Sequence, residues 1–109
     1  MTSAENEAAV KAEPLDPLIH ETSRLVIVSV LNECDSADFN FMLAATGLTR
    51  GNLSTHMARL VKAGYVDEEK QFVDRKPCTQ YRLTAAGRGA FVKYRAAWKR
   101  LTKGKNGRG

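Results

Sequence analysis

Five polar side chains share one face of an expected helix in the stretch LTRGNLSTHMARLVKAGYV, residues 48–66. The opposite face is apolar, because Leu53, Met57 and Leu60 recur at i, i+4 and i+7. Arginine can bond guanine through two hydrogen bonds, asparagine can do the same to adenine, and serine or threonine can bond base edges or phosphates. The pattern therefore fits base contact from a helix in the major groove of DNA. The polar side chains are Arg50, Asn52, Ser54, Thr55 and Arg59.

The helix that carries these side chains has clear boundaries in the sequence. Thr49 is expected to cap its N-terminus, and Gly64 is expected to end it. Because the N-terminal residues of a groove-binding helix reach deepest, Arg50 and Asn52 are expected base contacts, with Thr49 beside them. His56 lies next to the apolar face and is expected to be a packed or hydrogen-bonded core histidine. A solvated helix face would look the same in this stretch alone, so the neighbouring elements decide the interpretation.

Two helices are expected before this stretch. Asp16 and Pro17 resemble an N-cap followed by proline at the first helical position, which predicts a helix from about Pro17 to Glu33. Residues 35–36 break that helix, and residues 37–39 are expected to form a very short strand. A second short helix over residues 40–45 then ends at a C-terminal glycine, Gly47.

A hairpin and a last helix are expected after it. YVDEEKQFVD and CTQYRLT alternate in polarity, and the loop Arg75-Lys76-Pro77 joins them, which is typical of a β-hairpin. Thr84 is expected to cap a final helix from about Ala85 to Thr102. The order predicts an α+β fold, mostly α, with a three-helix core, a β-hairpin and an extra C-terminal helix.

Composition is ordinary for a globular protein, with 43% hydrophobic and 27% charged residues, so one domain over residues 15–102 is expected. Residues 1–14 are expected to be a disordered acidic tail, and residues 103–109 a flexible basic tail. Residues 1–20 carry four acidic side chains and one basic side chain, whereas the rest of the chain carries sixteen basic and eight acidic side chains. A basic domain favours a polyanionic partner, most simply nucleic acid.

Several other classes of protein are disfavoured. The apolar run at residues 25–28 is too short to span a bilayer, and the N-terminus lacks a signal-peptide pattern, so cytoplasmic residence without membrane contact is expected. Cys34 and Cys78 are far apart and form no paired motif, so buried or idle thiols are expected, with a redox or metal sensor as the alternative. Because hydrolase, nucleotide-binding and metalloprotease motifs are missing, neither an enzyme nor a cofactor or metal is expected.

The stretches GLTRGNLSTHMARLVKAGYV and RKPCTQYRLTAAGR resemble the small winged helix-turn-helix transcriptional regulators of the MarR and ArsR groups. The resemblance covers about residues 15–102. It implies that the polar helix is a recognition helix and that the loop at residues 73–78 is the wing, with Arg75 and Lys76 along phosphates or in the minor groove. It also implies a homodimer without a separate effector domain. The metal-binding cysteine cluster of the ArsR group is absent.

The last helix carries large side chains in a heptad-like seam. Phe91, Tyr94, Trp98 and Leu101 recur at spacings of three, four and three. We expect this helix to pair with a second copy, together with the first helix and its Leu18; packing on its own domain is the alternative. A twofold dimer would place two recognition helices about 34 Å apart, which matches a pseudo-palindromic operator.

The expected function is a homodimeric regulator that binds double-stranded DNA sequence-specifically and represses by occluding a promoter. The alternative is a winged-helix protein–protein interaction module within a larger complex, which an apolar patch on the recognition helix or the wing would favour. An effector pocket at the dimer interface is supported by no specific set of residues, so a small-molecule effector stays undetermined.

Overall fold

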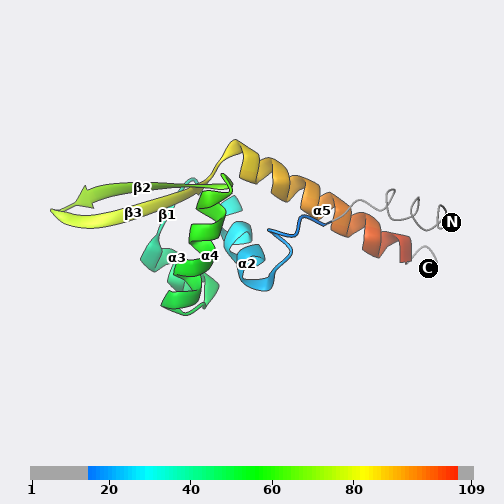
Figure 1. Cartoon of the computed structure of the whole chain (residues 1–109), viewed down its shortest axis with the longest axis horizontal. Helices are drawn as coiled ribbons and strands as arrows, with labels where there is room; N and C mark the ends of the chain where they lie inside the picture. Colours follow the sequence, from blue (N-terminus) through cyan, green and yellow to red (C-terminus); the bar gives the residue numbers. More distant parts are fainter. Residues whose placement is uncertain (1–14, 106–109) are drawn as a thin grey trace.

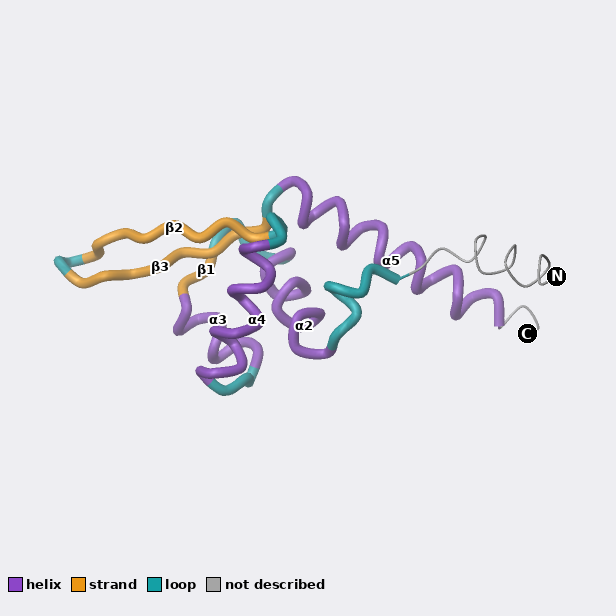
Figure 2. Tube along the Cα trace, in the orientation of Figure 1, coloured by secondary structure: helices purple, strands orange, loops and turns teal. Residues whose placement is uncertain are grey.

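The structure is a computed structural model that describes residues 15–105. Three helices, α2 to α4, gather beneath the base of a long hairpin, and a fourth helix, α5, extends away on the other side (Figures 1 and 2). The predicted order of elements and the predicted α+β class are both confirmed. In chain order the elements are α2 (Thr22–Asn32), β1 (Ala37–Asp38), α3 (Phe39–Thr46), α4 (Arg50–Lys62), β2 (Val66–Val73), β3 (Lys76–Leu83) and α5 (Ala85–Lys105).

Local capping fixes the ends of α3 and α4. The Asp38 carboxylate caps α3, and Gly47 ends it in the left-handed region at φ 73°. The Thr49 hydroxyl caps α4 by accepting a hydrogen bond from the Asn52 amide at 3.1 Å. Gly64, at φ 84°, lies just beyond the C-terminal end of α4. The predicted Thr49 cap and the two predicted terminating glycines of this helix-turn-helix unit are confirmed, whereas the Asp38 cap was not predicted.

The first described helix begins later than predicted. Asp16 and Pro17 do start a turn, in which the Asp16 carboxylate accepts a hydrogen bond from the Leu18 amide at 2.9 Å. The turn cannot continue into α2, because Glu21 is extended, with φ −150° and ψ 130°. The Leu18 carbonyl is bonded by the Arg24 side chain, Nε to oxygen 2.6 Å, instead of an amide one helical turn later. The predicted N-cap was therefore wrong, and Glu21 caps α2.

The hairpin turns one residue earlier than predicted. Asp74 and Arg75 are its two turn residues, with φ of 53° and 68°, and Val73 pairs with Lys76 across it. Two residues at positive φ match the twist of the flanking strands. The predicted loop Arg75-Lys76-Pro77 was therefore partly wrong, since Lys76 and Pro77 already belong to β3. β1 pairs with residues 80–81 of β3, so the proline lies where β3 has β2 as its only partner strand in the described sheet.

The hydrophobic core lies between α2, α3, α4 and the base of the sheet. The predicted apolar stripe of α4 is fully buried, with Leu53 and Leu60 at 0% exposure. Against it pack side chains from every neighbouring element, which fixes α4 rigidly beneath the hairpin. Other members of this core are Ile27, Val28, Leu31, Met42, Val66, Tyr81, Leu83, Phe91 and Tyr94.

The start of α5 packs against the turn between α4 and β2. Thr84 caps α5 as predicted, because its hydroxyl accepts from the Gly87 amide at 2.9 Å and donates to the Gly64 carbonyl at 2.6 Å. The Thr84 amide donates to the Tyr65 carbonyl at 3.0 Å. A Cβ added to Gly87 would lie 2.1 Å from that same carbonyl oxygen, so this crossing needs glycine.

The N-terminal segment is tied to the same turn. The Tyr65 hydroxyl donates to the Asp16 carboxylate at 2.5 Å. This hydrogen bond, with partial burial, raises the pKa of Tyr65 to about 12. Residues 15–21 are thereby held across the end of α4.

The last helix runs further than expected. α5 runs to Lys105, so residues 103–105 continue the helix instead of opening the predicted basic tail. The predicted acidic tail at residues 1–14 lies outside the described residues, as do residues 106–109.

Candidate nucleic-acid interface

The polar face of α4 is exposed along its whole length. Its apolar stripe faces the core, and all five polar side chains that the periodicity singled out reach solvent on the other side. This exposure is what contact with a DNA groove requires, because only the free edge of a helix can enter it. The five exposed side chains are Arg50, Asn52, Ser54, Thr55 and Arg59.

The N-terminal end of α4 holds its arginine against an aromatic ring. The Arg50 guanidinium carbon lies 5.7 Å from the centroid of the Phe39 ring, which is within cation–π range. Planar stacking leaves the guanidinium edge free to donate. This role of Phe39 could not be predicted from a local pattern, because α3 and the turn to α4 separate the two residues. Thr49 lies beside them, with its hydroxyl oxygen engaged in the helix cap.

The hairpin formed by β2 and β3, residues 66–83, is called the wing from here on. Between the wing and α3–α4 lies a cleft of about 360 Å³. Ser54 of α4 and Asn40 of α3 line one side, and Pro77 and Thr79 of the wing line the other. The recognition-type helix and the wing therefore share one concave surface.

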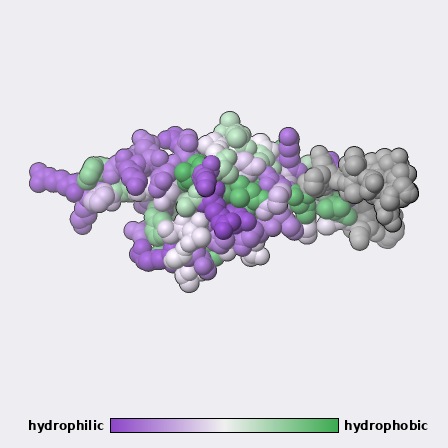
Figure 3. All heavy atoms as spheres, in the orientation of Figure 1, coloured by the Kyte–Doolittle hydropathy of each residue, from purple (hydrophilic) through white to green (hydrophobic). Residues whose placement is uncertain are grey.

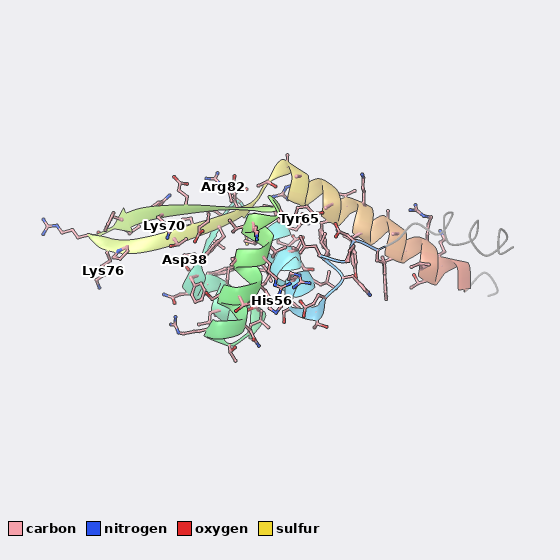
Figure 4. All side chains as sticks on the ribbon, viewed as in Figure 1. Asp38, His56, Tyr65, Lys70, Lys76 and Arg82 are labelled. Carbon is pink, nitrogen blue, oxygen red and sulfur yellow. The ribbon has the colours of Figure 1, made fainter. Side chains whose placement is uncertain are left out.

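The wing carries an ion pair near its base and three basic side chains in its distal half. Near its base Glu69 pairs with Arg82, oxygen to nitrogen 3.0 Å. Lys70 and Lys76 extend from its distal half (Figure 4), and Arg75 lies in the turn. Within residues 15–105, no salt bridge or hydrogen bond engages the side chains of these three basic residues. Sequence reasoning named Arg75 and Lys76 but missed Lys70, whose position depends on the strand register.

A buried arginine supports α4 from behind. Arg24 of α2 is 9% exposed, and its guanidinium lies 3.1 Å from His56 Nδ1. Because arginine can only donate, the histidine nitrogen accepts. His56 lies between α4 and α2 (Figure 4), which confirms its prediction as a hydrogen-bonded histidine. The Arg24 amide also donates to Glu21, which lowers the pKa of that carboxyl.

The expected dimer seam on α5 is divided. Phe91 and Tyr94 are buried in the core of their own domain, as the alternative interpretation had it, and the Tyr94 hydroxyl bonds His20 Nδ1 at 2.8 Å. Trp98 is 50% exposed and Leu101 44% exposed, so only the distal half of the seam is open to a partner. Leu18 is half-buried against the core.

Neither a metal-ligand cluster nor a membrane-spanning helix is present in the part of the chain that the structure describes. Among residues 15–105, no group of three or more histidine, cysteine or acidic side chains could hold a metal ion. Cys34 and Cys78 are both free and half-buried. No helix in the same range combines the length and apolarity that crossing a membrane requires.

Comparison with known proteins decides the family. A model of the winged helix DNA-binding domain matches residues 23–102. The chain belongs to this winged-helix family. The winged-helix match runs from the first turn of α2 into the distal part of α5, so it includes both sides of the cleft.

Relatives of this winged-helix chain include regulators. An uncharacterized protein of Methanocaldococcus jannaschii, MJ0432, is 29% identical over 77 residues, which cover 71% of this chain and 84% of the relative. A transcriptional regulator homologue from Pyrococcus horikoshii OT3 superposes with TM-score 0.79 at 26% identity, over 90% of this chain and 96% of that one.

Two further solved structures share the fold. A transcriptional regulator of the MarR family from Silicibacter pomeroyi has TM-score 0.61 at 21% identity, covering 81% of this chain and 61% of its own. The M. tuberculosis transcriptional regulator MosR, solved in complex with DNA, has TM-score 0.66 at 20% identity, covering 94% of this chain and 72% of its own. The predicted resemblance to small winged-helix regulators of the MarR type is thus confirmed.

Proposed function

We propose that this winged-helix protein is a transcriptional regulator that binds double-stranded DNA without enzymatic activity. Its recognition helix α4 enters the major groove, and its wing lies along the backbone and minor groove. The observation that carries the proposal is the shared cleft, with the exposed polar face of α4 on one side and the basic distal wing on the other. The DNA complex of MosR, which has the same fold, supports it.

The proposed active form is a cytoplasmic homodimer that represses by covering a promoter. Trp98 and Leu101 leave an apolar surface on the distal half of α5, where a second copy of the helix would bury it. A twofold axis there presents two copies of α4 to a pseudo-palindromic operator, about 34 Å or a multiple of that apart. Leu18 and the nearby face of α2 are the proposed remainder of this interface.

The alternative, a protein–protein interaction module, would need an apolar patch on α4 or on the wing. Phe72 and Val73 are exposed at the distal end of the wing, but no such patch lies on α4. The exposed large hydrophobic side chains of the described residues lie on α3, β2 and α5, and α4 contributes none. Figure 3 shows hydrophilic surface over most of the wing, with a hydrophobic patch near its distal end, and surface of mixed hydropathy over the helices below it. The polar row on α4 therefore suits a polar, charged partner better than a protein groove.

The deciding experiment is DNA binding by fluorescence anisotropy across a salt series. The probes are a random-sequence duplex and a duplex from the region upstream of the protein's own gene, and sedimentation of the same samples gives the oligomeric state. Tighter, salt-sensitive binding of a dimer to the upstream duplex is expected. No binding to either duplex at low salt would overturn the proposal.

Arg50→Ala is expected to weaken binding to the preferred duplex by roughly tenfold to a hundredfold, as for loss of one bidentate base contact. Binding to random duplex should change much less, so discrimination falls. Arg95→Ala is the matched control, because Arg95 also lies 5.7 Å from a phenylalanine ring but on α5. Anisotropy titrations of both variants test this, and equal losses on both duplexes for Arg50→Ala would contradict base reading.

Arg75→Ala is expected to weaken binding to all sequences and to reduce the salt slope by about one unit, since one phosphate contact is lost. Arg82→Ala should change the slope less, because Arg82 is already paired with Glu69. The measurement is the dependence of the logarithm of the affinity on the logarithm of salt concentration. An unchanged affinity and slope for Arg75→Ala would remove the turn of the wing from the interface.

A further inference from the structure

The wing carries an exposed aromatic side chain that the proposed function does not yet use. Phe72 is 77% exposed, more than the other exposed large hydrophobic side chains of the described residues, and the next residue, Val73, is 51% exposed. Both lie at the end of β2, beside the turn. An apolar surface at the tip of a projecting hairpin gains free energy when a partner covers it.

The strand register decides which way Phe72 faces. Side chains alternate along a strand, and residues directly opposite each other share a face. Phe72 is opposite Pro77, and Lys70 is opposite Thr79, so these four share one face of the wing. Pro77 and Thr79 line the cleft opposite Ser54 of α4. Phe72 therefore lies on the cleft side of the wing, at its distal end, and Val73 lies on the other face.

The surroundings of Phe72 indicate a polyanion as its partner. Lys70 lies on the same face, Arg75 follows in the turn, and Lys76, opposite Val73, lies on the other face. Over residues 70–77 three basic side chains accompany one acidic side chain, Asp74. A minor groove presents phosphates along both edges and apolar sugar faces inside, which matches an apolar centre flanked by cations. Architectural proteins insert phenylalanine or proline at base steps in this groove.

We propose that Phe72, backed by Pro77, is a specificity-determining contact of the wing in the minor groove. It packs against deoxyribose and wedges against a base step, and Lys70 and Arg75 hold the flanking phosphates. This inference rests on the proposed function. Because pyrimidine–purine steps unstack most easily, the wing favours DNA with such a step at its contact point.

The test compares Phe72→Ala with Val73→Ala, its neighbour on the opposite face. Both side chains are exposed, so both variants should fold, which thermal unfolding by circular dichroism checks. We expect Phe72→Ala to weaken duplex binding about tenfold with an unchanged salt slope, since the lost contact is apolar. Val73→Ala should weaken it less than about twofold, because Val73 faces away from the cleft.

A second measurement reads the step preference directly. The wild type should bind an alternating TpA duplex more tightly than an A-tract duplex of equal length, and Phe72→Ala should bind the two more equally. Unchanged affinity of Phe72→Ala, equal losses in both variants, or an unaltered step preference would each overturn the proposal. If wild type binds no duplex, the proposed function itself fails, and that result is distinct from the other three.

Discussion

Gly87→Ala is expected to lower the free energy of unfolding by about 3 kcal/mol or more, at or above the upper end of ordinary overpacking costs. The new Cβ would lie 2.1 Å from the Tyr65 carbonyl oxygen. The Cβ position is fixed by the backbone of α5 and the oxygen belongs to the backbone of Tyr65, so no side-chain rotation can relieve the clash. That carbonyl also accepts the Thr84 amide at 3.0 Å, so shifting it breaks the capped start of α5 as well. Urea unfolding followed by circular dichroism measures the change.

The same helix supplies the control. Gly89 has nothing within 4 Å of an added Cβ, so Gly89→Ala should raise stability by about 0.5–1 kcal/mol through helix propensity alone. Two identical substitutions, two positions apart, should therefore have opposite signs. Wild-type stability in Gly87→Ala would show that α5 does not cross the α4–β2 turn as closely as described.

Elements fixed by local chemistry could be predicted from the sequence. Thr49 bounds α4 through its side-chain hydroxyl, and Gly47 and Gly64 follow the ends of α3 and α4 at positive φ, so the pattern is visible in the chain itself. The polar row and apolar stripe of α4 follow from the helical period in the same way. These local signals were enough to predict the order of the elements and the exposed polar face of α4.

Features that depend on distant contacts could not be predicted. The start of α2 is a different case, because its cap is local: Glu21 accepts from the Arg24 amide, but glutamate is not among the usual N-cap residues. Periodicity found the seam on α5 but not its division, because burial of Phe91 depends on which elements lie beneath it. Lys70 and Phe72 were missed for a related reason, since only the register shows that they share the face of the wing that borders the cleft.

Arg24→Met is expected to lower the free energy of unfolding by about 2–3 kcal/mol. The substitution removes the donor from two partly buried acceptors, and a buried polar group without a hydrogen-bond partner is costly. Methionine fills much of the arginine volume, so the loss reports hydrogen bonds more than packing. The Leu18 carbonyl would lose a 2.6 Å hydrogen bond, and His56 Nδ1 would lose its 3.1 Å donor. Both groups lie where α2 supports the back of α4.

Arg88→Met provides the comparison for that substitution. Arg88 also bonds two oxygens, those of the Asn32 backbone and side chain at 3.2 and 3.0 Å, but it is exposed. Water can replace an exposed donor, so this variant should lose less than about 1 kcal/mol. Equal losses in the two variants, measured by urea unfolding, would mean that burial of Arg24 is energetically unimportant. A selective loss in Arg24→Met would instead identify the arginine as the polar link that positions α4 on the core.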